Sequence, residues 1–204
     1  MLNPLRRIPL KLVIESLYGF KILPFNSVSQ KDRAVLEVLK KAAELAGQNA
    51  NKKGIRMTRA NEVGNAMEPF IKRALGTLKY KAEKPLSASG VRRSTGYPDL
   101  EFTDQFGRMH YLESKTFNIR NLNTTQRSFY LSPSADSKII RSCHHFAVSF
   151  EMYVAGRSKK QNIYKCRSWK IISLENLLVD VKHEFNADNA RLYSKNLVLA
   201  EGEI

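Results

Sequence analysis

Residues 98–117, PDLEFTDQFGRMHYLESKTF, contain two stretches in which apolar and polar side chains alternate, with a turn sequence between them. Alternation with a period of two residues is typical of a strand that buries one of its faces. The intervening DQFG can form a turn, so the two stretches are expected to pair as a hairpin. Any fold for this chain must therefore build a β-sheet around its middle.

A helix is expected before the hairpin, from Gln30 to about Ala46. Ser29 and Asp32 form a start that resembles a capping box, and apolar residues recur at helical spacing through this range. Gly47 predicts the end of the helix. The following residues 48–59, QNANKKGIRMTR, contain no acid and are expected to form a basic loop.

A second helix is expected from roughly Arg59 to Leu75, because its apolar residues recur at three- and four-residue spacing. Glu68 lies on the rim of the apolar face, where a side chain can be held against the edge of the core, whereas Glu62 points to solvent. Pro69 predicts either a kink or a shorter helix in which Glu68 is the cap.

Two further strands are expected at residues 144–156 and 162–174, joined by the basic turn GRSKKQ, and residues 175–185 are expected to form a helix. The order of helices, strands and a final helix predicts a mixed α/β fold in which helices flank a central mixed β-sheet. The length fits a single domain over residues 1–204, with a helical N-terminal part to about residue 57 and the core from about residue 58.

The charge of the chain indicates its partner. It carries 34 Lys and Arg against 19 Asp and Glu, a formal net charge of +15. Such an excess favours nucleic acid first and an anionic membrane second, although a basic soluble protein without a polyanionic partner is an alternative. No segment is long and apolar enough to span a membrane. Cys143 and Cys166 are too few for a disulfide framework and lack metal-ligand spacing, so reduced thiols and a cytoplasmic location are expected.

The hairpin would bring acidic side chains together in this basic chain. If the strands pair, Asp99 and Glu113 converge at one end, and Lys115 points the same way as Glu113. Facing carboxylates repel unless a cation lies between them, and Mg²⁺ takes oxygen ligands of this kind, to which the backbone carbonyl of Ser114 could add. Such a site could activate a water for phosphodiester hydrolysis. The alternative is that Asp99 is a turn residue and that Glu113 and Lys115 form a solvated strand face.

Pro98–Asp99 together with Glu113-Ser114-Lys115 resembles the motif of the PD-(D/E)XK nuclease superfamily. The stretch NEVGNAMEPFIKRAL, residues 61–75, resembles the acid-bearing helix that precedes this motif. The resemblance implies a restriction-endonuclease-like fold with Mg²⁺ as the cofactor. It implies that Asp99 and Glu113 are metal ligands and that Lys115 positions the attacking water. Glu68 would be a supporting acid, with Glu62 as its rival for that role.

The chain length, the motif and the later residues 130–150, YLSPSADSKIIRSCHHFAVSF, are most similar to a type II restriction endonuclease. This resemblance implies cleavage of double-stranded DNA at a specific sequence by a homodimer, since a palindromic site demands two-fold symmetry. A structure-selective DNA nuclease, such as a junction resolvase or repair enzyme, and a non-catalytic basic nucleic-acid-binding module are the alternatives. The binding module does not explain why acids cluster where they would weaken phosphate binding.

Side chains that could contact DNA lie on both sides of the motif. Residues 118–128, NIRNLNTTQRS, follow the second strand directly and are rich in side chains that hydrogen-bond to base edges. Four of them are expected to act as a group: Arg120, Asn123, Gln126 and Arg127. Arg92 and Arg93 are expected to contact phosphates. A solvated polar loop is the alternative for both segments.

Two other polar pairs have weaker signals. His144 and His145 precede an apolar strand, where adjacent residues face opposite ways, so packing is expected rather than metal binding. Ser134 and Lys138 are candidates for phosphate contacts, although helix capping would explain Ser134 equally well.

Overall fold

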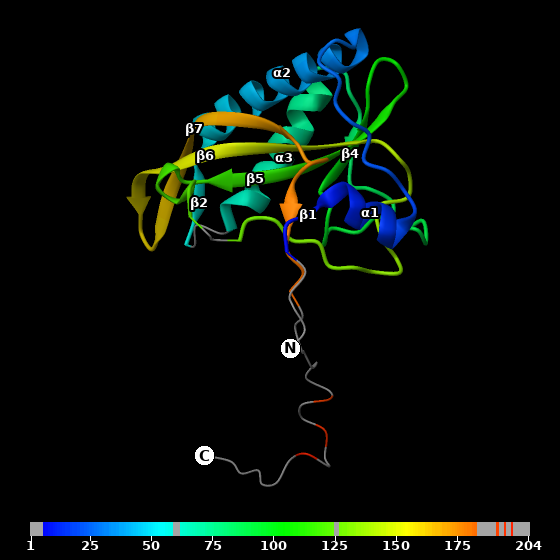
Figure 1. The fold of residues 1–204 in the computed structure, drawn as a ribbon. Helices are drawn as coiled ribbons and strands as arrows, with labels where there is room; N and C mark the ends of the chain where they lie inside the picture. Colours follow the sequence, from blue (N-terminus) through cyan, green and yellow to red (C-terminus); the bar gives the residue numbers. More distant parts are fainter. Residues whose placement is uncertain are drawn as a thin grey trace.

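The computed structural model describes residues 6–58, 62–124 and 127–182, with Arg191, Ser194 and Leu197 beyond them. Its centre is a six-stranded sheet with the order β2-β7-β6-β5-β4-β3 (Figure 1). Strands β5 and β6 run parallel, and the other neighbours run antiparallel. The strands are β2 (Ile55–Met57), β3 (Ala82–Glu83), β4 (Leu100–Thr103), β5 (Met109–Phe117), β6 (His144–Ser158) and β7 (Gln161–Ser173).

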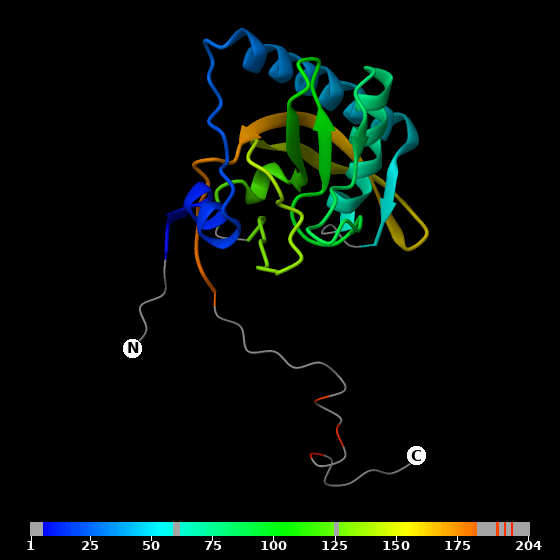
Figure 2. The ribbon, with the colours of Figure 1, turned by 90° about the vertical axis from the view of Figure 1, so that its right-hand side faces the viewer.

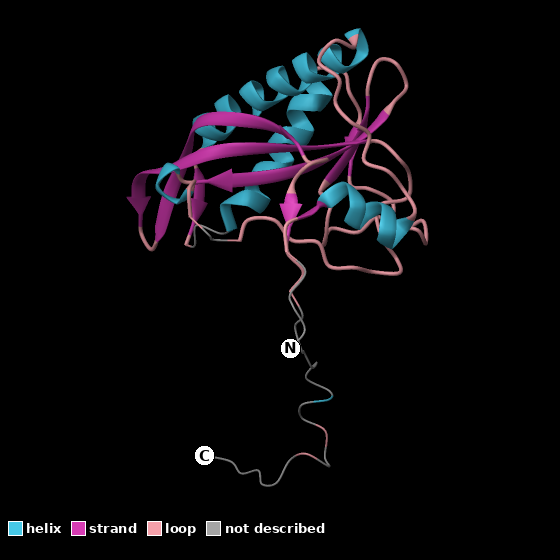
Figure 3. Cartoon of the chain, viewed as in Figure 1, coloured by secondary structure: helices cyan, strands magenta, loops and turns pink. Residues whose placement is uncertain are grey.

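Helices cover the sheet on both sides. α2 (Gln30–Lys53) and α3 (Val63–Thr77) pack together over one face, and α1 (Leu10–Tyr18) lies on the other side (Figures 2 and 3). The mixed α/β fold expected from the sequence is therefore confirmed. Among the residues described, no helix combines the length and the apolarity that crossing a bilayer requires.

The sheet separates two hydrophobic cores. Leu100, Phe102 and Leu112 belong to the core that α2 and α3 complete, whereas Tyr111 and Ala147 belong to the core under α1. The consecutive residues Tyr111 and Leu112 thus face opposite ways, as alternation with a period of two requires. The expected hairpin is confirmed, and Leu100 pairs with Leu112 across it.

α2 begins where the sequence predicts but ends later. The Ser29 hydroxyl accepts a hydrogen bond from the backbone N–H of Asp32 at 3.3 Å, which caps the first turn. The predicted end at Gly47 is wrong, because the helix continues until Gly54 with its φ of +68°. At Gly47 the helix passes close to β7, and a Cβ there would lie 3.3 Å from the sulfur of Cys166. The glycine allows this close packing, and most of the expected basic loop is helix and strand.

α3 continues through Pro69. The proline therefore does not make Glu68 a helix cap, and the Arg73 side chain donates a hydrogen bond to the Pro69 carbonyl at 3.2 Å. Residues 59–61, which the predicted helix included, lie outside the described residues. Glu62 is the residue before the first turn.

The helix expected at residues 175–185 is wrong wherever the chain is described. Leu178 and Val179 form strand β8 (Leu178–Val179), which pairs antiparallel with β1 (Ile8–Pro9). Leu177 and Val179 pack on the core under α1, whereas Leu178 is 48% exposed. A period of two therefore applies to these apolar residues, because their partner is a strand from the other end of the chain. Residues 183–185 lie outside the described part.

A buried ion network holds the turn of the β4–β5 hairpin. Asp104 accepts hydrogen bonds from the backbone N–H groups of Phe106 and Arg108 and from the Arg108 side chain, each at 2.9 Å. Arg108 also donates to Asp32 of α2 at 2.6 Å. The His110 ring lies 3.0 Å from the same Asp104 carboxylate. These contacts join the turn to the start of α2 and so hold the register of the hairpin.

We expect Arg108→Met to lower the free energy of unfolding by about 3 kcal/mol, because it leaves two buried carboxylates without their cation. Lys40→Met is the matched control, since it removes an exposed ion pair with Glu37 and should cost less than about 0.5 kcal/mol. Urea unfolding followed by circular dichroism measures both values. Equal effects of the two substitutions would contradict the role of the network.

Candidate active site

The hairpin register places two carboxylates opposite each other. Because Leu100 pairs with Leu112, Asp99, the residue just before β4, comes next to Glu113 of β5. Asp99 Oδ2 accepts a hydrogen bond from the backbone N–H of Ser114 at 2.8 Å. The Asp99 side chain is thus fixed against β5, beside Glu113, and the convergence expected from the sequence is present.

Glu113 is held in an unfavourable environment for an anion. It is only 5% exposed, and its Oε1 lies 2.7 Å from the ammonium of Lys115. Its Oε2 is buried and has no hydrogen-bond partner among the described residues. Burial first, and the negative charge of Asp99 second, raise the pKa of Glu113 to about 7, while Lys115 acts in the opposite direction.

Lys115 lies on the same strand face as Glu113, as the period of two predicts. Its ammonium lies 5.9 Å from the centre of the Phe129 ring, in addition to its ion pair with Glu113. The side chain remains partly exposed. The ammonium is therefore positioned by the protein and still accessible to a water or a substrate.

The carbonyl of Ser114 faces β4 without a backbone donor from that strand. In an extended strand the N–H and C=O of one residue point to the same side, and the Ser114 N–H points to Asp99. The β4–β5 register ends at Leu100, and Pro98, two residues before it, has no N–H to donate. The proline of the motif thus leaves this oxygen available beside the two carboxylates.

Glu68 and Glu62 have different surroundings. Glu68 is partly buried on α3, and its Oε1 lies 3.4 Å from the ammonium of Lys84. Its charge acts on Lys138 together with the charges of Asp99 and Glu113. Glu62 is exposed at the start of α3, where its side chain makes no capping hydrogen bond.

The sequence suggested Lys138 only as a phosphate contact and did not predict that its side chain is buried beside Pro98. Lys138 is 4% exposed and donates a hydrogen bond to the carbonyl of Pro98 at 2.6 Å. Burial lowers the pKa of Lys138, while Asp99 and then Glu113 act to raise it. No local pattern could have found this contact, because it joins residues 40 positions apart.

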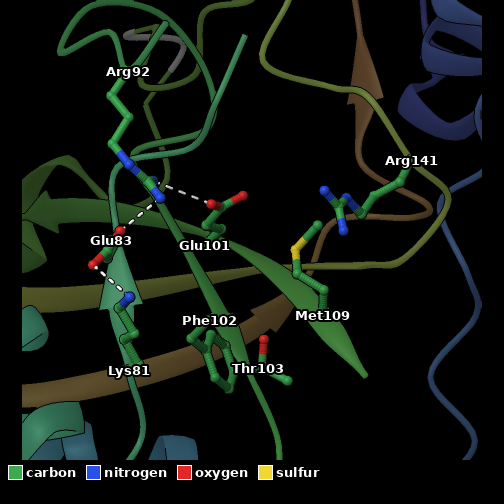
Figure 4. A pocket seen from close by; sticks show the side chains of 8 residues that line it. All are labelled: Lys81, Glu83, Arg92, Glu101, Phe102, Thr103, Met109 and Arg141. Carbon is green, nitrogen blue, oxygen red and sulfur yellow. Dashed lines mark hydrogen bonds and ion pairs between the residues drawn. The ribbon is translucent and has the colours of Figure 1, made fainter. Parts of the chain in front are cut away.

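The arginines expected to contact phosphates are paired with carboxylates. The guanidinium of Arg92 forms ion pairs with Glu83 at 2.6 Å and Glu101 at 3.2 Å, beside a cavity of about 200 Å³ (Figure 4). Arg93 pairs with Asp136 at 2.5 Å. A DNA phosphate would have to exchange with these carboxylates to reach either guanidinium.

The segment expected to read bases begins directly after β5. Arg120 and Asn123 are exposed, and the exposed Arg127 guanidinium lies 5.3 Å from the centre of the Tyr130 ring. Gln126 lies outside the described residues. Arg120 lies in a short 3-10 helix, Ile119–Asn121, two residues after the strand that carries Glu113 and Lys115, and Asn123 follows that helix.

The histidines pack as the sequence predicts. His145 Nδ1 lies 2.6 Å from the hydroxyl of Tyr97, and His144 Nδ1 lies 3.1 Å from the carbonyl of Leu23. Within the described ranges, no three His, Cys, Asp or Glu side chains are grouped to hold a metal ion. The carboxylates of Asp99 and Glu113 lie together at the end of the hairpin, beside the Ser114 backbone.

Comparison with known proteins identifies the family. Residues 4–196 match the family described as type II restriction enzyme MjaV. The chain belongs to this restriction enzyme family. The type II restriction enzyme MjaV of Methanocaldococcus jannaschii is 35% identical over 219 residues, which cover 100% of this chain and 93% of that protein. No solved structure matches the chain.

Membership of the MjaV family confirms the expectation of a type II restriction enzyme, which is a site-specific deoxyribonuclease. A non-catalytic binding module, one of the alternatives considered from the sequence, is disfavoured by this result.

The raised pKa of Glu113 predicts how stability depends on pH without metal. The folded state holds the Glu113 proton up to about pH 7, whereas an unfolded glutamic acid releases it near its ordinary pKa of 4.5. The stabilisation from this proton is therefore complete below pH 4.5 and is lost as the pH rises to about 7.

We expect the wild type to lose more stability than Glu113→Gln between about pH 5 and about pH 8, because the variant cannot ionise at this position. Urea unfolding of both proteins in a chelating buffer measures the difference, and the other titrating groups cancel in the comparison. Parallel pH profiles for the two proteins would show that Glu113 does not titrate in this range.

Proposed function

We propose that the chain is a Mg²⁺-dependent endonuclease of the PD-(D/E)XK type that hydrolyses phosphodiester bonds in double-stranded DNA at a specific sequence. The observation that carries the proposal is the placement of Asp99 beside a buried Glu113, one oxygen of which has no hydrogen-bond partner in the described part of the chain. The family supports the substrate class, because the named relative is a type II restriction enzyme.

The donor atoms fit Mg²⁺. Two carboxylates and a backbone carbonyl are hard oxygen ligands, and Mg²⁺ is commonly held by one or two carboxylates while it keeps several waters. A divalent cation would supply the partner that Glu113 Oε2 lacks and would relieve the repulsion from Asp99. Asp99 accepts one hydrogen bond from the Ser114 N–H, and a carboxylate has further lone pairs, so Asp99 would still be able to hold the ion.

Each side chain near the proposed metal site has a separate role in hydrolysis. When bound, Mg²⁺ supplies a lowered pKa for a coordinated water and a positive charge against the phosphate oxygens. Glu113 fixes the ammonium of Lys115 at 2.7 Å, and the remaining donors of that ammonium hold the attacking water. Glu68 acts as the supporting acid in this proposal, since its charge acts on Lys138 together with those of Asp99 and Glu113, whereas Glu62 is exposed at the start of α3.

DNA would lie across the face that carries these groups. The net charge of +15 attracts the phosphate backbone. Arg92 and Arg93 contact phosphates after exchange with their carboxylate partners. The loop after β5 reads base edges through Arg120, Asn123, Gln126 and Arg127, of which Gln126 lies outside the described residues.

The first test of the proposal is cleavage of phage DNA by the purified protein. We expect discrete fragments with Mg²⁺ and none in a chelating buffer. Asp99→Ala and Lys115→Ala should each reduce the rate at least about 100-fold, because each removes a group that acts on the reacting atoms. Both variants should still shift labelled DNA in gel electrophoresis.

The matched pair Glu68→Gln and Glu62→Gln separates the two candidate acids in the same assay. We expect a lower rate for Glu68→Gln and a rate near that of the wild type for Glu62→Gln. Near wild-type cleavage by Asp99→Ala or Lys115→Ala would refute the assigned roles. A preference for branched duplexes over linear phage DNA would favour a structure-selective nuclease instead.

The active form in this proposal is a homodimer, because a two-fold symmetric enzyme cuts both strands of a palindromic site in one encounter. Light scattering of the protein bound to its DNA site should give a protein mass twice the chain mass of 23.3 kDa. One chain per site would contradict the dimer.

A further inference from the structure

Lys138 is a cation that the fold has withdrawn from water next to the candidate active site. It is 4% exposed, and it directs its ammonium at the carbonyl of Pro98, 2.6 Å away. Within the described ranges, no carboxylate forms a direct ion pair with it. Burial of an ammonium costs stability, and an apolar residue of similar length would make the folded state more stable. A lysine at this position therefore suggests that its charge has a function.

The charges around Lys138 are those of the candidate site. Asp99 contributes the largest attraction to its ammonium and Glu113 the next, while Lys84 opposes them. The lysine thus lies in the field of both carboxylates but binds the backbone of the residue that precedes Asp99. Its hydrogen bond acts on the peptide from which the Asp99 side chain projects.

The backbone is anchored on both sides of Lys138, at Ser137 and at Ile140. The carbonyl of Ser137 accepts a hydrogen bond from the Ala88 N–H at 2.9 Å. The N–H of Ile140 donates to the Tyr111 hydroxyl at 3.2 Å, and Tyr111 belongs to β5. The backbone of Lys138 is therefore held against the strand that carries Glu113, and its side chain spans from there to Pro98.

We propose that Lys138 is a positioning residue for DNA cleavage: it fixes the Pro98–Asp99 peptide so that the Asp99 carboxylate faces Glu113. This inference rests on the proposed function, because it takes Asp99 as a metal ligand. Lys138 acts on the reaction through Asp99 and does not touch the reacting atoms.

The direction in which metal affinity changes when Lys138 is replaced distinguishes a positioning role from a simple electrostatic effect. A positive charge close to a metal site repels the cation, so its removal should tighten metal binding. A lysine that orients a ligand does the opposite, because its removal lets the ligand move away; loss of such outer contacts commonly weakens metal affinity about 10- to 100-fold. The two roles therefore predict opposite effects of the same substitution.

The experiment is titration of the DNA-free protein with Mn²⁺, followed by the electron paramagnetic resonance of the free ion. We expect Lys138→Met to weaken Mn²⁺ binding about tenfold, with a matching rise in the Mg²⁺ concentration needed for cleavage. Lys84→Met is the matched control, since this ammonium pairs with Glu68 and does not contact the motif backbone. Its removal should leave Mn²⁺ binding unchanged or tighter.

Unchanged or tighter Mn²⁺ binding by Lys138→Met would overturn the positioning role. Asp99→Ala separates this failure from failure of the proposed function: if that variant binds Mn²⁺ as the wild type does, the metal site itself is assigned wrongly. If the Met variant folds poorly, Lys138→Ala with added n-propylamine provides a second test. The amine replaces the side-chain atoms that the alanine lacks. The amine should restore Mn²⁺ binding and n-propanol should not, and equal restoration by both would also overturn the proposal.

Discussion

The register of the β4–β5 hairpin is the constraint on which the candidate site depends. Because successive residues of a strand face opposite sides, a slip of one residue would turn Glu113 towards α3 and away from Asp99. The pairing of Leu100 with Leu112 prevents this slip, since both belong to the core under α2 and α3. At the other end of the hairpin, the buried carboxylate of Asp104 fixes the turn.

The same register creates an arrangement that is unfavourable by itself. Two carboxylates lie side by side, and one of them is buried with an oxygen that has no partner among the described residues. The protein holds them with local positive charge: Lys115 pairs with Glu113, and Lys138 lies in the field of both acids. On the proposed function, the remaining imbalance is what a divalent cation relieves.

The net charge of the chain and the ion pairs near the site have different consequences for a polyanion. The chain as a whole is strongly basic, which favours approach of a polyanion at long range. The arginines before the motif are nonetheless neutralised by carboxylates such as Glu83 and Asp136. On the proposed function, DNA exchanges one set of ion pairs for another at these positions, so the net gain from each contact is smaller than that of a free guanidinium. An exchange of ion pairs of this kind adds little to the affinity for DNA, but it penalises a partner that does not offer a phosphate at the right position.

Local periodicity in the sequence was enough to predict the hairpin, the two long helices and the approach of Asp99, Glu113 and Lys115, because each depends on residues close together in the chain. The tertiary structure alone decided features that depend on distant partners. Gly47 continues a helix because β7 passes close to it, and residues 178–179 form a strand because β1 lies beside them. Lys138 likewise reaches Pro98 only after the chain between them has folded, since a hydrogen bond between distant residues leaves no spacing in the sequence to read.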